Sequence, residues 1–202
     1  MNPLMSIKGS LILGFAAAVV IAVVAGGGWA FNWLSLARWL HIVTGITWIG
    51  LLYYFNVVQV PGLAAAAADK GGPGGAGITK YVAPRALLWF RWSALATFLL
   101  GCALLGSAHG RFLDTFTFGA ASGVAGPMTV TMGIGAWFGT IMLFNVWVLI
   151  WPNQKKILGI VPATDEEKAT ARKVALLASR TNFVLSIPML MCMVGPSHGL
   201  PF

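Results

Sequence analysis

Five long apolar segments dominate this sequence, and they constrain its fold more than any other feature. A helix needs roughly 20 apolar residues to cross the hydrocarbon core of a bilayer. Backbone groups must pair internally in lipid, which favours helices. The sequence therefore predicts an all-α integral membrane protein, a bundle of about five transmembrane helices in one domain over residues 1–202. The predicted spans are residues 9–31, 36–60, 84–107, 128–151 and 174–195.

The composition agrees with this prediction. The chain is 58% hydrophobic and only 9% charged, whereas soluble domains are about 25% charged. Its net charge of +8 does not indicate a nucleic-acid partner, because the Lys and Arg residues flank apolar segments, where they orient helices and contact lipid headgroups. The first segment has a rival interpretation as a signal peptide, but it is long for one and no clear cleavage site follows. The expected surroundings are the lipid bilayer.

The distribution of basic residues predicts the orientation in the membrane. Loops after the second and fourth segments hold most of the Lys and Arg, while the opposite side holds chiefly Arg38 and Arg111. The positive-inside rule then places the N-terminus in the cytoplasm and the C-terminus outside. In this orientation all three histidines of the chain, His41, His109 and His198, fall at the outer face.

The second segment carries a polar stripe that lipid would not tolerate on its own. Stepping about 100° per residue, the stripe is roughly 80° wide. It must face protein or a bound group, and Gly45 leaves room for another helix or a flat cofactor. The stripe therefore either holds the helix to its neighbours or lines a cofactor site. Its members are Arg38, His41, Gly45, Trp48, Leu52, Asn56 and Gln59.

The histidines at one face allow two kinds of cofactor site. A pair can ligate the iron of haem b, with His41 as the first ligand, His109 or His198 as the second, and Arg38 near a propionate. Trp48 lies on the same stripe as His41. Imidazole also suits copper and similar metals. The alternative is that no cofactor is bound and the terminal histidines are solvated.

Two arginines lie inside apolar segments and are candidates for binding an anion. Arg91 and Arg180, the latter with Asn182 nearby, are placed to contact an anionic headgroup or substrate, or to snorkel to the interface independently. All five acidic residues lie in or near loops. A proton pump or cation-coupled transporter usually needs an acidic relay within the membrane, so this class is disfavoured.

Four segments in succession resemble the membrane domain of the bacterial membrane-bound urate hydroxylase (urate oxidase N-terminal) family. They are WLHIVTGITWIGLLYYFN at 39–56, RALLWFRWSALATFLLG at 85–101, MLFNVWVLIWPNQKKI at 142–157, and LASRTNFVLSIPMLM at 177–191 with a closing SHG. The WLH and WIG pattern is also similar to other small haem-binding membrane proteins with a His near the start of a helix.

The resemblance implies a multi-pass protein of the bacterial inner membrane, so the outer side on which the positive-inside rule places the C-terminus would be the periplasm. It also implies oxidoreductase chemistry with cytochrome c as electron acceptor. The sequence contains no CxxCH motif, so the resemblance is to a short form without the family's cytochrome c domain, working with a separate cytochrome or other membrane redox subunits. The alternatives are a cofactor-free structural subunit that packs into a larger complex through Gly135 and Gly139, and a small-molecule transporter that oligomerises. Neither the substrate nor the oligomeric state follows from the sequence.

Overall fold

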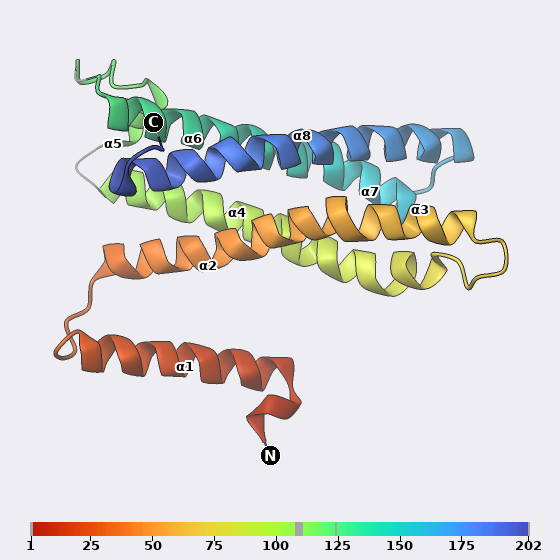
Figure 1. Cartoon of the computed structure of the whole chain (residues 1–202), viewed down its shortest axis with the longest axis horizontal. Coiled ribbons are helices and arrows are strands. Elements are labelled where there is room, and N and C mark those ends of the chain that lie inside the picture. Colours follow the sequence, from red (N-terminus) through yellow and green to blue (C-terminus); the bar gives the residue numbers. More distant parts are fainter. Residues whose placement is uncertain (1, 108–110, 124, 202) are drawn as a thin grey trace. The chain divides into compact units, whose positions relative to one another are not determined.

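The protein is built from helices that are long enough to cross a membrane. The computed structural model describes residues 2–107, 111–123 and 125–201. Within these residues, five helical stretches have the length and apolar composition of membrane spans (Figure 1). The prediction of an all-α, multi-pass membrane protein is confirmed. The five stretches are Ile7–Ala25, Trp33–Ala68, Ile78–Ser107, Pro127–Ile157 and Asp165–His198.

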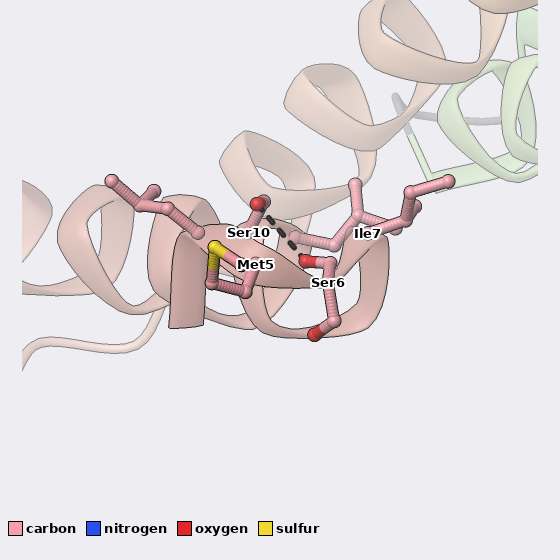
Figure 2. A pocket seen from close by; sticks show the side chains of 6 residues that line it. Met5, Ser6, Ile7 and Ser10 are labelled. Carbon is pink, nitrogen blue, oxygen red and sulfur yellow. Dashed lines mark hydrogen bonds between the residues drawn. The ribbon is translucent and has the colours of Figure 1, made fainter. Parts of the chain in front are cut away.

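The chain divides into two units, Met1–Leu36 and Ala37–Phe202. The first unit contains a short 3-10 turn, η1 (Pro3–Met5), and helix α1 (Ile7–Ala25), which Ser6 caps by accepting a hydrogen bond from the Gly9 N–H at 3.0 Å. Every residue of α1 is described, and none is buried within this unit. Figure 2 shows a shallow, open hollow where η1 meets α1.

The second unit contains most of α2 and all of the following elements. The helix α2 (Trp33–Tyr53) continues through the π-helical segment η2 (Tyr54–Gln59) into α3 (Val60–Ala68). The π-helical segment η3 (Ile78–Val82) leads into α4 (Ala83–Ser107), and the short α5 (Arg111–Phe116) follows. The helix α6 (Pro127–Phe144) continues through η4 (Asn145–Ile150) into α7 (Trp151–Ile157), and α8 (Asp165–His198) runs beside α6 and α7 (Figure 1).

Local sequence explains where several of these helices begin and end. Thr164 and Glu167, three residues apart before an apolar segment, have the spacing that predicts a capping box, and they form one, with the Glu167 carboxylate accepting from the Thr164 N–H at 2.8 Å. This box fixes the start of a helix of 34 residues. Residues 64–68, where the alanine run before the glycine-rich stretch 71–77 predicts a linker, are helical instead. They extend the continuous helix Trp33–Ala68, and alanine is the best helix former.

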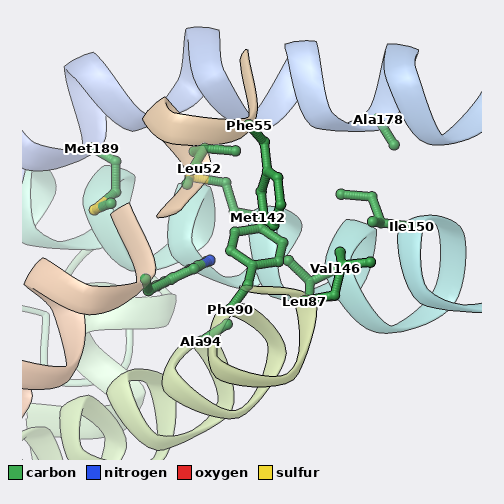
Figure 3. Packing of buried hydrophobic residues seen from close by; sticks show 11 residues of the cluster. Leu52, Phe55, Leu87, Phe90, Ala94, Met142, Val146, Ile150, Ala178 and Met189 are labelled. Carbon is green, nitrogen blue, oxygen red and sulfur yellow. The ribbon is translucent and has the colours of Figure 1, made fainter. Parts of the chain in front are cut away.

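The core of the second unit lies where α2, η2, α4, α6, η4 and α8 meet (Figure 3). Phe55 and Phe90 form an edge-to-face ring pair with centroids 5.3 Å apart. Because lipid is as apolar as these side chains, close packing and hydrogen bonds hold such helices together. Gly135 illustrates the packing: a Cβ at this position would lie 2.9 Å from the Cβ of Cys192 on α8. The Gly135 side of α6 is therefore used inside the chain.

The π-helical segments η2 and η4 each interrupt a long span, one in each half of the second unit. The N–H of Val60 bonds to the carbonyl of Phe55, and the N–H of Trp151 bonds to that of Val146, each five residues back. Each segment contains one buried asparagine, Asn56 or Asn145. Such widened turns often accompany functional sites in membrane and soluble helices.

Candidate functional site

The structure places His41 on α2 against the backbone of α4. Its Nδ1 lies 2.8 Å from the carbonyl oxygen of Thr97. A carbonyl only accepts hydrogen bonds, so Nδ1 carries the proton in this contact. In the neutral ring, Nε2 then keeps its lone pair. This is the arrangement by which proteins fix the tautomer of a histidine that binds a metal.

A glycine on α4 makes space for the His41 ring. A Cβ at Gly101 would lie 3.1 Å from the ring carbon Cε1 of His41. At Gly45, one turn along α2, the nearest atom to a Cβ position is Thr97 Cγ2 at 3.6 Å, an ordinary van der Waals contact. Gly101 therefore leaves the space that the His41 ring occupies against α4. This contact between α2 and α4 could not be predicted from α2 alone, because its partner lies 56 residues away.

The other predicted cofactor residues are placed as follows. His198 is exposed on the last turn of α8, and Arg38 is exposed near the start of α2. His109 lies outside the described residues. Trp48 is only 2% exposed, and its indole N–H has no hydrogen-bond partner in the described part of the chain. Among the described residues, no three or more His, Cys, Asp or Glu side chains gather as a set able to hold a metal ion.

Asn182 belongs to a buried polar network between α6 and α8. Its Nδ2 donates to the Met142 carbonyl at 2.9 Å, and its Oδ1 accepts from Asn145 Nδ2 at 2.8 Å. One turn earlier on α8, Ser179 Oγ accepts from Asn56 Nδ2 at 2.9 Å. The amide of Asn182 is thus engaged inside the protein, and the network joins η2, α6 and η4 to α8.

The two intramembrane arginines have different surroundings. The Arg91 guanidinium on α4 lies over the Trp151 ring of α7, 3.7 Å from its centroid. Arg180 on α8 is exposed and forms no hydrogen bond, ion pair or ring contact in the described residues. In the described residues, Arg91 and Arg180 therefore share no contact partner.

A repeated pattern relates the two halves of the second unit. The motif WIGLLYYFNV at 48–57 returns as WFGTIMLFNV at 137–146, and ALLWFR at 86–91 returns as ALLASR at 175–180, both 89 residues later. The same spacing relates three pairs of buried polar residues, Asn56 with Asn145, Ser93 with Asn182, and Thr97 with Ser186. The internal repeat of 89 residues is the sequence signal that identifies these polar residues, and it is not visible in any one segment alone.

The repeats have also diverged. Trp48 is buried, whereas its counterpart Trp137 is 43% exposed and donates through its indole N–H to the Phe116 carbonyl at 3.1 Å. His41 has no histidine counterpart, because Val130 stands 89 positions later. The histidine contact with α4 is thus particular to the first half.

The family comparison covers most of the chain. The model of the urate oxidase N-terminal family matches residues 28–116 and 112–202, two stretches of similar length that overlap only at residues 112–116. Comparison with curated proteins found no match, and comparison with solved structures found none either. The family match spans α2 to α8, including the histidine contact, the polar network and both arginines. The chain therefore belongs to the urate oxidase N-terminal family.

Proposed function

We propose that this chain is the membrane subunit of an oxidoreductase of the urate hydroxylase type, and that it binds haem b through His41. Family membership supports a urate hydroxylase-like membrane domain. The observation that carries the haem proposal is the bond between His41 Nδ1 and the Thr97 carbonyl at 2.8 Å. It orients the ring and leaves Nε2 available as a ligand.

Three further residues are candidates for contacts with such a group. Bound haem supplies one-electron transfer. His41 would bind the haem iron, and His198, on the last turn of α8, is the candidate for a second ligand. Arg38 lies one turn before His41 and offers a charge for a propionate. The unpartnered indole N–H of Trp48 is a buried donor on the same helix, which a polar group of the ligand would satisfy.

Under this proposal electrons leave at the end of the bundle where α2 begins. By the positive-inside rule this is the outer face, where a separate cytochrome c or another redox subunit can approach. In bacteria the membrane would be the inner one. The substrate of the complex would be urate, in keeping with the family.

The proposal is tested by a reduced-minus-oxidised optical spectrum of the detergent-purified protein. A b-type band is expected in the wild type and is expected to be lost in His41→Ala. Gly101→Val places methyl groups on the His41 ring and should diminish the band. Gly106→Val, on the same helix with nothing near its Cβ position, should leave the band unchanged.

Two results would contradict the proposal. One is a wild-type protein without a haem band after expression with excess haem. The other is a band that His41→Ala leaves intact, which would move the ligand elsewhere. Reduction of added cytochrome c by membranes supplied with urate tests the substrate separately.

A further inference from the structure

The Arg91 guanidinium is oriented by stacking on the ring of Trp151. The guanidinium carbon lies 3.7 Å from the centroid of the Trp151 ring. At this distance the cation is stacked on the indole face. Trp147, one turn earlier, packs edge-to-face with Trp92 at 5.4 Å between centroids. This aromatic cluster holds the arginine side chain against the η4–α7 stretch.

Stacking occupies the face of the guanidinium and leaves its N–H edge unused. A guanidinium has five N–H donors in its plane. In the described part of the chain, no carboxylate, carbonyl or hydroxyl accepts from Arg91. A fixed plane with free donors matches a phosphate, which accepts two parallel hydrogen bonds from arginine.

The depth of Trp151 indicates where such a phosphate would come from. The continuous helix Pro127–Ile157 has 31 residues, or roughly 46 Å at 1.5 Å per residue, against about 30 Å of hydrocarbon. A helix of this length centred in the bilayer extends about 8 Å into the headgroup layer on each side. Trp151 lies six residues from the end of α7, roughly 9 Å, and hence at the boundary of hydrocarbon and headgroups.

The charges nearby favour a headgroup with net negative charge. Lys155 follows Trp151 by one helical turn on the same face of α7 and is half-buried. Lys156 instead lines a hollow with Glu166 and Glu167 at the start of α8. A second cation thus stands on the headgroup side of Arg91 and Trp151, which favours a headgroup with net negative charge.

We propose that Arg91, Trp151 and Lys155 form a binding site for an acidic phospholipid, which is held through its phosphate. The site lies at the lysine-bearing end of the bundle, which is the cytoplasmic leaflet by the positive-inside rule. It is independent of the haem proposal, which concerns the other end of α2 and α4. The lipid would tie α4 to α7 and so stabilise the contact between the two halves.

Arg180 provides a matched control. It occupies the equivalent position of the repeat, ALLASR against ALLWFR. It is exposed and has no stacked ring. The residue 89 positions before Trp151 is Gly62, so the second half lacks the indole at the corresponding place. Arg91→Gln and Arg180→Gln remove the same charge from the same motif.

The test measures lipid retention by native mass spectrometry and thermal unfolding in nanodiscs of phosphatidylcholine with and without phosphatidylglycerol. We expect wild type and Arg180→Gln to retain phosphatidylglycerol and to unfold at a higher temperature when it is present. Arg91→Gln should retain it roughly tenfold less, the loss expected for a charge-assisted pair, and should lose the thermal shift. Lys155→Gln removes the second cation of the site and should also lower the retention of phosphatidylglycerol.

Several outcomes would overturn the proposal. Equal losses in Arg91→Gln and Arg180→Gln would show unspecific attraction to charge. Unchanged retention in Arg91→Gln would remove the site. If Arg91→Gln does not fold, unchanged retention in both Lys155→Gln and Arg91→Lys, which keeps the charge but not the planar edge, would do the same. An equal thermal shift from inorganic phosphate in detergent would assign the site to a free anion instead of a lipid.

Discussion

Replacing Asn182 by alanine tests whether the buried polar network holds α8 to α6. The side chain is 0% exposed. It accepts from Asn145 Nδ2 at 2.8 Å and donates to the Met142 carbonyl at 2.9 Å. The substitution removes both bonds and leaves the Asn145 donor without a partner in a dry environment.

The expected loss follows from these two contacts. Hydrogen bonds between membrane helices contribute about 0.6 kcal/mol on average and about 1.7 kcal/mol at most. A buried donor left unpaired adds a penalty of about 1–3 kcal/mol. Two such bonds and this penalty together predict that Asn182→Ala lowers the free energy of unfolding by about 2–4 kcal/mol.

The measurement is unfolding of the bicelle-reconstituted protein by increasing SDS, followed by circular dichroism. Asn153→Ala is the control, because Asn153 Nδ2 donates at 2.8 Å to the Leu149 carbonyl of its own helix stretch and joins no second helix. That control should lose less than about 0.5 kcal/mol. If Asn182→Ala is as stable as the control, the network does not hold the helices together and the reasoning fails.

Three further predictions concern packing and capping. Gly135→Leu should lower the unfolding free energy in the same assay by about 1–3 kcal/mol, because its Cβ would lie 2.9 Å from that of Cys192; Gly106→Leu, with open space, should not. Thr164→Ala should lose about 1 kcal/mol by removing the capping box with Glu167, and normal stability would contradict this role. Thr164→Ser, which keeps the hydroxyl, should restore most of the loss.

Much of the fold could be predicted because it depends on local sequence. Twenty or more apolar residues in a row indicate a membrane helix wherever they occur, and Thr164 with Glu167 starts α8 through contacts within one turn. The family could also be recognised from successive motifs, and the family match confirms it. The helical state of residues 64–68 does not follow from the sequence, because a short alanine run beside glycines is compatible with a linker as well as with a helix.

The candidate site depended on contacts that no local pattern encodes. The spans, the polar stripe of α2 and the choice of His41 as the foremost histidine follow from the order of residues alone. The contacts of His41 with the Thr97 carbonyl, 56 residues away, and of Asn56 with Ser179, 123 residues away, depend on how the helices pack. The tertiary structure also gave Arg91 an indole partner and left Arg180 exposed, although both follow the same ALL motif. The physical reason is that hydropathy and capping act within a few residues, whereas the faces that helices present to each other are set by how side chains of distant segments pack.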